Sequence, residues 1–212
     1  MTSAATCFSA IVLAAGSSSR MQGVHKLLLP IGGEPLIRRT VGAVLEADPQ
    51  ELVVVTGFQE AAIRAALQGL PIRLQSNPRF ERGQMSSVTV GVRALTMSVD
   101  AVMVCLGDMA LLTGQDYREL VEVFAQRADR SIVVPRFEGQ RGNPILIDER
   151  HLLQLLSDQR NLGCRKLIAD YPHEVLAYDS AHDRFVVDID TPEDYAQVVR
   201  RVASLPTQGG GA

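Results

Sequence analysis

The chain's 212 residues, 46% hydrophobic and 21% charged, have the balance of a soluble globular protein with one sizeable core. A net charge of −3 gives no general attraction to nucleic acid or to an anionic membrane, and no apolar run approaches the ~20 residues of a membrane span. Because Cys7, Cys105 and Cys164 lack the spacing of a disulfide framework or a zinc site, and the N-terminus lacks the pattern of a signal peptide, we expect a cytoplasmic protein.

The first predicted strand is the apolar run over 9–15, which stops at Gly16. Serines follow at 17–19, and then cations at Arg20 and Lys26. Uncovered backbone N–H groups, hydroxyls and positive charge all bind phosphate, so the segment predicts an anion-binding loop. It matches neither G-x-x-x-x-G-K-[ST] nor G-x-G-x-x-G, and is therefore neither an ordinary P-loop nor an ordinary dinucleotide fingerprint. The alternative is a solvated loop with surface cations.

Apolar strands and amphipathic helices alternate along the rest of the chain. We expect further strands at 52–55, 72–75, 101–106, 131–135, 144–147, 175–178 and 185–187. We expect helices at 34–48, at 60–67, from an N-cap at Ser86-Ser87 to 95, and at 115–127, 148–156, 164–171 and from an N-cap at Thr191 onward.

Continuous apolar strands between amphipathic helices predict an α/β fold, a three-layer sandwich with a mostly parallel sheet. We find no internal repeat and no linker between domains. Residues 1–205 are therefore expected to form a single domain. The glycine-rich tail, 206–212, is expected to be disordered.

Two acidic motifs follow predicted strands. Asp108 comes just after the strand at 101–106, at the sheet edge where the first loop also ends. Asp188 and Asp190 lie on one side of an extended segment before the last helix. Magnesium would bridge such carboxylates to phosphates. The competing interpretations are a turn aspartate that stabilises its own backbone, and acids that serve a helix N-terminus.

Three other features are weaker candidates. Asn77, with the serines at 86–87, would bind ribose or phosphate, or would form an ordinary capped loop. The segment 141–144 would bring a glycine and an amide to a ligand, although its composition favours a turn. His25, beside Lys26, is a candidate lining residue of the same site.

The motifs occur in the order found in the molybdenum cofactor nucleotidyltransferases, which the chain resembles from about Ala10 to about Val199. Guanylyl-transferring relatives usually have Leu-Ala-Gly-Gly at the first loop, so the likeness is greater to the cytidylyl-transferring members. The motifs that carry the resemblance are Leu13-Ala14-Ala15-Gly16, Arg20-Met21, Lys26-Leu27-Leu28, Asn77-Pro78, Gly83 with Ser86-Ser87, Gly107-Asp108-Met109, Gly142-Asn143-Pro144 and Asp188-Ile189-Asp190-Thr191-Pro192.

The resemblance implies a Rossmann-like nucleotidyltransferase that joins CMP from CTP to the terminal phosphate of molybdopterin, with Mg²⁺, and releases pyrophosphate. Its catalytic residues would be Lys26, Arg20 and Asp108, and its metal ligands Asp108 and Asp190. Asn143 and Asp188 would lie on the acceptor side, and a molybdoenzyme is the implied partner. The implied nucleotide-binding residues are Leu13, Ala14, Ala15, Gly16, Ser17, Ser18, Arg20, Lys26, Asn77, Ser87 and Asp108.

The chain departs from the family pattern on the acceptor side. Ala110 stands where the family commonly has proline, and Asn143 where many relatives have histidine, so the acceptor is less closely defined than the nucleotide. The cytidylyltransferases of isoprenoid synthesis share the Leu-Ala-Ala-Gly opening, but they usually continue to Pro-Lys-Gln, where this chain has His25-Lys26-Leu27.

Two other functions stay open. One is an NAD(P)H-dependent oxidoreductase of the same superfamily, against which the missing G-x-G-x-x-G and the paired acids argue. The other is a non-catalytic protein that carries the molybdenum cofactor and inserts it into an enzyme. Such a carrier would have no use for an intact Asp108 and Asp190.

Overall fold

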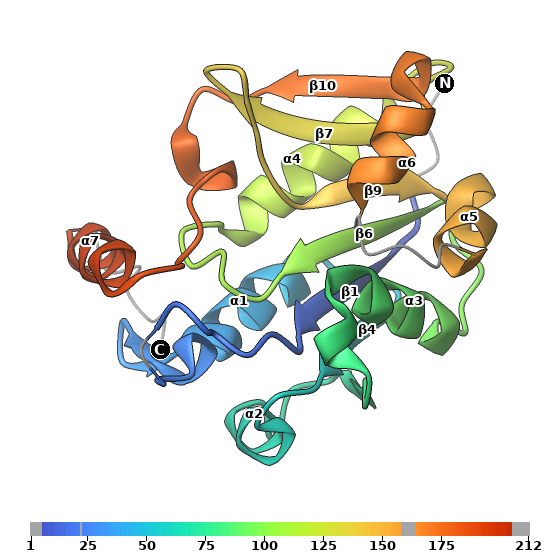
Figure 1. The fold of residues 1–212 in the computed structure, drawn as a ribbon. Coiled ribbons are helices and arrows are strands. Elements are labelled where there is room, and N and C mark those ends of the chain that lie inside the picture. The colour runs from blue at the N-terminus through green and yellow to red at the C-terminus, as the bar shows by residue number, and fades with distance from the viewer. Residues whose placement is uncertain (1–5, 22, 158–163, 205–212) are drawn as a thin grey trace, which may run out of the picture.

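A mostly parallel sheet forms the centre of the molecule (Figure 1). The computed structural model describes residues 6–21, 23–157 and 164–204. Within them, the sheet order is β10 (Val175–Asp179), β7 (Ile132–Phe137), β9 (Ile145–Asp148), β6 (Ala101–Leu106), β1 (Phe8–Ala14), β4 (Leu52–Thr56) and β5 (Arg73–Ser76), with β8 (Gln140–Arg141) paired to β7. β1 pairs in parallel with β4 and β6, whereas β9 is antiparallel to both of its neighbours. The predicted fold class is confirmed.

Helices cover both faces of the sheet, because alternate strand residues point to opposite faces. In β1, Ala10, Val12 and Ala14 pack into one core, while Ile11 packs into the other. The first core contains buried residues of α1 (Leu36–Leu45), α4 (Gly114–Ala125) and α7 (Pro192–Ala203), and Ile63 of α2 (Glu60–Ala66). The second contains residues of α3 (Gln84–Ala94), α5 (Leu152–Ser157) and α6 (Cys164–Asp170). These layers form the predicted sandwich.

The predicted strand at 185–187 is wrong. Asp183–Phe185 is a short 3-10 helix, and 187–190 has no regular secondary structure. The Phe185 side chain is fully buried, and its carbonyl oxygen accepts the N–H of Asn143 at 2.9 Å. The apolar residues of this segment therefore serve the core without entering the sheet.

The predicted N-cap of α3 is also wrong. The helix begins at Gln84, after Gly83 with φ 92°, and Ser86 lies inside its first turn, where its hydroxyl donates to the Gly83 carbonyl at 2.7 Å. By contrast, Thr191 is the predicted N-cap of α7 and forms a capping box with Asp194. Residues 34–35 pair with β2 (Pro30–Ile31) as the short strand β3 (Glu34–Pro35), so α1 begins at Leu36.

Two further expectations concern membrane-spanning helices and the glycine-rich tail. Among the described residues, no helix is long and apolar enough to cross a membrane. The tail at 206–212 lies outside the described residues.

Close packing of α3 on the sheet gives a stability prediction. A Cβ on Gly91 of α3 would lie 2.4 Å from Ile11 Cγ2, whereas a Cβ on Gly42 of α1 would meet nothing within 4 Å. We expect Gly91→Ala to lower the free energy of unfolding by about 1–3 kcal/mol through overpacking. Gly42→Ala is the matched control and should raise it by up to ~1 kcal/mol through helix propensity. Urea denaturation of both variants tests this, and equal effects would contradict the described packing.

The buried Asp116 of α4 predicts a pH dependence of stability. Burial alone would raise the pKa of its carboxyl, but hydrogen bonds from Arg184 and Thr113 lower that pKa below its usual value. Its contribution is therefore present above the unfolded pKa of ~3.9 and is lost as pH falls through the lower folded-state value. Asp116→Asn should reduce the free energy of unfolding by about 2 kcal/mol at neutral pH and by much less near pH 3.

The exposed Asp129 is the control for this measurement. Asp129→Asn should leave the free energy of unfolding nearly unchanged at both pH values. A wild-type advantage over Asp116→Asn that persisted undiminished at low pH would show that the carboxylate charge is not its source.

Candidate active site

The first loop and the Asp108 loop leave the sheet side by side. β1 and β6 are parallel neighbours with Leu13 opposite Leu106, so their carboxyl ends meet at one edge. The Gly107 N–H donates to the Leu13 carbonyl oxygen at 3.0 Å, and a Cβ on Gly107 would lie 2.9 Å from that oxygen. Glycine is therefore needed where β6 turns, and the turn presents Asp108 to the first loop.

Three carboxylates meet at this edge. Oxygen atoms of Asp108, Asp188 and Asp190 all lie within 4.8 Å of one another. We call these three residues the acid cluster. Asp108 follows β6, while the other two precede α7. The Asp194 carboxylate that caps this helix also accepts the N–H of Asp190 at 3.1 Å, which holds Asp190 in place.

Two cations bind the acid cluster. Lys26 Nζ lies 2.5 Å from Asp108 Oδ2 and 3.0 Å from Asp190 Oδ1, and Arg20 Nη1 lies 2.7 Å from Asp190 Oδ2. Burial alone would lower the pKa of the Lys26 ammonium, but the charge and hydrogen bond of Asp108, together with those of Asp190, raise it above its usual value. Lys26 is therefore positively charged throughout the physiological pH range.

The acid cluster has the chemistry of a divalent cation site. Burial and the charges of Asp108 and Asp190 raise the pKa of Asp188, because three close carboxylates repel one another. Asp108 Oδ1 is buried and has no hydrogen-bond partner among the described residues. A buried carboxylate oxygen without a partner is costly, and hard oxygen ligands of this kind suit Mg²⁺ or Mn²⁺. The residues present therefore fit such an ion.

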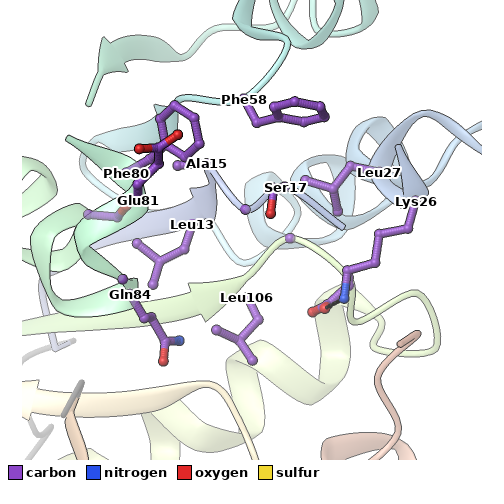
Figure 2. Close-up of a pocket in the computed structure, with 15 residues that line it drawn as sticks. Leu13, Ala15, Ser17, Lys26, Leu27, Phe58, Phe80, Glu81, Gln84 and Leu106 are labelled. Carbon is purple, nitrogen blue, oxygen red and sulfur yellow. Dashed lines mark hydrogen bonds and ion pairs between the residues drawn. The ribbon is translucent and has the colours of Figure 1, made fainter. Parts of the chain in front are cut away.

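A pocket of about 500 Å³ opens beside the acid cluster (Figure 2). In Figure 2, Phe80 and Ala15 lie at one side of it and Lys26 at the opposite side. Its lining residues are Leu13, Ala15, Gly16, Ser17, Lys26, Leu27, Phe58, Phe80, Glu81, Gly83, Gln84, Ser87, Leu106, Gly107 and Asp108. An apolar, aromatic wall opposite a cation and a carboxylate suits a ligand with a flat ring at one end and phosphates at the other.

The aromatic side of this pocket is tightly built. A Cβ on Gly57 would lie 2.8 Å from Phe80 Cβ and 2.9 Å from the Ala15 methyl group. Phe58 stands next to Phe80, with 6.4 Å between the ring centroids. Phe58, Phe80 and Ala15 therefore form a closely packed apolar wall of the pocket.

Some of the predicted residues of the first loop line the pocket, and others hold the loop in place. Gly16 and Ser17 line the pocket, whereas Ala14 is fully buried in the core. Arg20 does not line the pocket, but it reaches the acid cluster with a largely exposed side chain. Ser18 adopts φ 53° and accepts the Lys26 backbone N–H at 3.2 Å. This bond fixes Lys26 relative to the loop.

His25 connects the two ends of the pocket. Its Nε2 lies 3.3 Å from the Phe58 carbonyl oxygen, which can only accept, so Nε2 carries the hydrogen and Nδ1 accepts from the Ser18 hydroxyl at 3.4 Å. Burial lowers the pKa of His25, partly opposed by the Phe58 carbonyl, so the ring is neutral at pH 7. His25 therefore acts as a support and does not supply charge.

Asn77 is likewise a support. It is buried, and its Nδ2 donates to Ser86 Oγ and Ser87 Oγ, both at 2.9 Å. Ser87 lines the pocket, whereas Asn77 does not. The first turn of α3 is thus held in place by the residue that begins the irregular segment after β5.

A second pocket, of about 370 Å³, lies on the other side of the acid cluster. It contains both residues predicted on the acceptor side, Asn143 and Asp188. Met109, next to Asp108, also lines it. The acid cluster therefore contributes Asp108 to the first pocket and Asp188 to the second.

Sequence reasoning missed the aromatic wall and Gln84. Phe58 lies in a turn after β4, and Phe80 in a 3-10 helix (Phe80–Arg82) before α3, so neither belongs to a charged or glycine-rich motif. The one available signal was the place of Phe58 in the sequence relative to a predicted strand. Phe58 follows a buried strand directly, at the edge where ligands bind in open α/β sheets.

Comparison with known proteins identifies the family of this chain. The family described as MobA-like NTP transferase domain matches residues 10–176. The purine catabolism protein PucB of Bacillus subtilis is 30% identical over 203 residues, which cover 92% of this chain and 96% of PucB. The bifunctional protein GlmU of Cutibacterium acnes is 33% identical over 119 residues, or 55% of this chain. The matched part is 28% of GlmU, so the likeness covers only part of that longer protein.

A solved structure extends the likeness to the whole fold. A nucleotidyl transferase from Methanothermobacter superposes with a TM-score of 0.79 at 26% identity, covering 93% of this chain and 98% of the other. The chain therefore shares the whole fold of a nucleotidyl transferase. The chain belongs to the family of MobA-like NTP transferase domains.

Proposed function

We propose that this nucleotidyltransferase transfers CMP from CTP to the terminal phosphate of a molybdopterin-type acceptor and releases pyrophosphate. One observation carries the proposal. Asp108 lines the first pocket, Asp188 lines the second, and their carboxylates lie within 4.8 Å of each other. Two pockets that meet at one charged cluster suit a transfer between two bound substrates.

The first pocket supports CTP as the donor. Its aromatic end is lined by Phe58 and Phe80 beside the Ala15 methyl group, and these apolar surfaces would stack on a base. The choice of cytosine rests on Ala15 in the Leu13-Ala14-Ala15-Gly16 motif of the family resemblance. The side chain of Gln84 supplies an amide that can both donate to and accept from the edge of a base. At the opposite end, Gly16, Ser17 and Lys26 would bind the triphosphate.

The reaction is a displacement at phosphorus. An oxygen of the acceptor phosphate forms a bond to the α-phosphorus of CTP, the bond to the bridging oxygen breaks, and pyrophosphate leaves with that oxygen. No side chain becomes covalently modified, so the chain's contribution is to position the substrates and to neutralise charge. Lys26 would exchange its carboxylate partners for phosphate oxygens, and Arg20 would reinforce it from the exposed side.

A divalent cation would complete the site. Asp108 and Asp190, with Asp188 close by, would hold Mg²⁺, which neutralises charge on phosphate oxygens. The acceptor and the molybdoenzyme that would receive the product rest on the family resemblance and on the second pocket beside Asp188.

Substrate choice tests the proposed reaction. We expect pyrophosphate release from CTP, and much less from ATP, GTP or UTP, only when molybdopterin and Mg²⁺ are both present. A coupled pyrophosphate assay with each triphosphate measures this, and omitting the acceptor or adding EDTA provides the controls. Preference for a purine triphosphate would contradict the base assignment. Oxidation of NADPH without pyrophosphate release would favour the oxidoreductase.

Removing either partner of the central ion pair tests the mechanism. Lys26→Ala and Asp108→Asn should each lower kcat/KM by about a hundredfold or more, because each removes charge that compensates the phosphates. The control is Lys166→Ala, which removes the chain's other lysine, paired with Asp170 within α6. Its activity should match the wild type.

Circular dichroism separates a catalytic loss from misfolding in these variants. Full activity in a folded Lys26→Ala variant would remove Lys26 from the mechanism, and the same holds for Asp108→Asn.

A further inference from the structure

Two arginines lie close together on the second pocket. Arg141 ends β8 and is half-buried, and Arg165 lies in the first turn of α6. Burial and the charge of Arg165 both lower the pKa of Arg141, so the guanidinium groups are within electrostatic reach of each other. Like charges held together and partly out of water are unfavourable unless a negative group compensates them.

Among the described residues, neither guanidinium group has a carboxylate partner. The side chains of Arg141 and Arg165 form no hydrogen bond or ion pair in the described part of the chain, whereas those of Arg127 and Arg184 each bind a carboxylate. Asp188 shares the pocket, but it belongs to the acid cluster. The described lining of the pocket therefore carries two cationic side chains against the single acid Asp188, which the other carboxylates of the acid cluster already surround.

The loop that carries Arg141 is fixed before any ligand binds. The Gly142 N–H donates to the Pro135 carbonyl at 2.8 Å, and the Asn143 N–H donates to the Phe185 carbonyl at 2.9 Å. A Cβ on Gly142 would lie 2.4 Å from that same Phe185 oxygen, so only glycine permits the approach. A wall that is already ordered loses little conformational entropy on binding.

We propose that Arg141 and Arg165 form an oxyanion-binding site that holds an anionic group of the acceptor substrate. The inference rests on the proposed function, because it takes the second pocket to be the acceptor's. The planar guanidinium fork matches tetrahedral oxyanions, which phosphate and molybdate both are. The anion is either the acceptor's own phosphate or a metal oxyanion that the acceptor carries.

A binding experiment tests the site without turnover, with inorganic phosphate as the probe in isothermal titration calorimetry. Arg141→Gln and Arg165→Gln should each weaken phosphate binding by about tenfold, because each removes a charge-assisted hydrogen-bonding partner. Arg93→Gln changes an exposed arginine outside both pockets and should bind like the wild type. Unchanged binding in both pocket variants, or loss only in Lys26→Ala, would overturn the proposal.

Kinetics then identify which anion of the acceptor is bound. Both pocket variants should raise the KM for the acceptor about tenfold and leave the KM for CTP within about twofold, and Arg141→Lys should recover part of the loss. An equal effect with metal-free and molybdenum-loaded acceptor identifies the phosphate. A larger effect with the loaded acceptor identifies the metal oxyanion.

The two proposals can fail separately. Phosphate binding that depends on both arginines, in a protein that transfers CMP to no molybdopterin, would leave the oxyanion site standing and refute the proposed reaction. If the wild type transfers CMP to molybdopterin and both variants keep an unchanged KM for the acceptor, the proposed reaction stands and the oxyanion site is refuted.

Discussion

The bridge of Lys26 to two carboxylates is the interaction on which the candidate site depends. One ammonium group joins the loop after β1, the turn after β6 and the segment before α7. These three segments belong to different parts of the chain. Each carries a charged side chain that would be unfavourable if it were buried alone. Their mutual neutralisation lets a charged centre form at the edge of an apolar sheet.

The bridge would also prepare the site for the anionic substrate proposed above. Lys26 is held by ligands that a metal ion can take over, which would leave its ammonium free to bind phosphate. Among the described residues, one buried oxygen of Asp108 has no hydrogen-bond partner. The free-energy cost of leaving it unpaired would be offset by the proposed cation. The described arrangement therefore suits a site whose charges are redistributed when substrate and metal enter.

Much of this architecture could be predicted from the sequence because hydrophobic patterning marks the strands and helices along the chain. Apolar runs stopped by glycine placed Gly16 and Asp108 at the carboxyl ends of strands, and parallel pairing brings such ends together. The segment after Phe185 could not be assigned in this way. Its apolar residues fill the core from a 3-10 helix, and only the tertiary contact with the 142–143 backbone distinguishes it from a strand.

Charged residues and glycines of the candidate site could be predicted from the sequence. Its aromatic residues could not. Lys26, Asp108 and Asp190 are brought into contact, but Phe58 and Phe80 carry no pattern that separates a pocket wall from a core residue. The arginines at 141 and 165 belong to different elements and meet only in the lining of the second pocket. The role proposed for them depends on the lack of a carboxylate partner among the described residues, which a sequence cannot display.

The capping of α7 has a consequence for how the protein is made. Asp190 is held by the cap of the last helix, and its partner Lys26 lies 164 residues earlier. During synthesis the sheet's first strands and the loop after β1 emerge long before this helix does. The acid cluster is therefore completed only after Asp190 has left the ribosome, so a nascent chain carries Lys26 and Asp108 before their third partner exists.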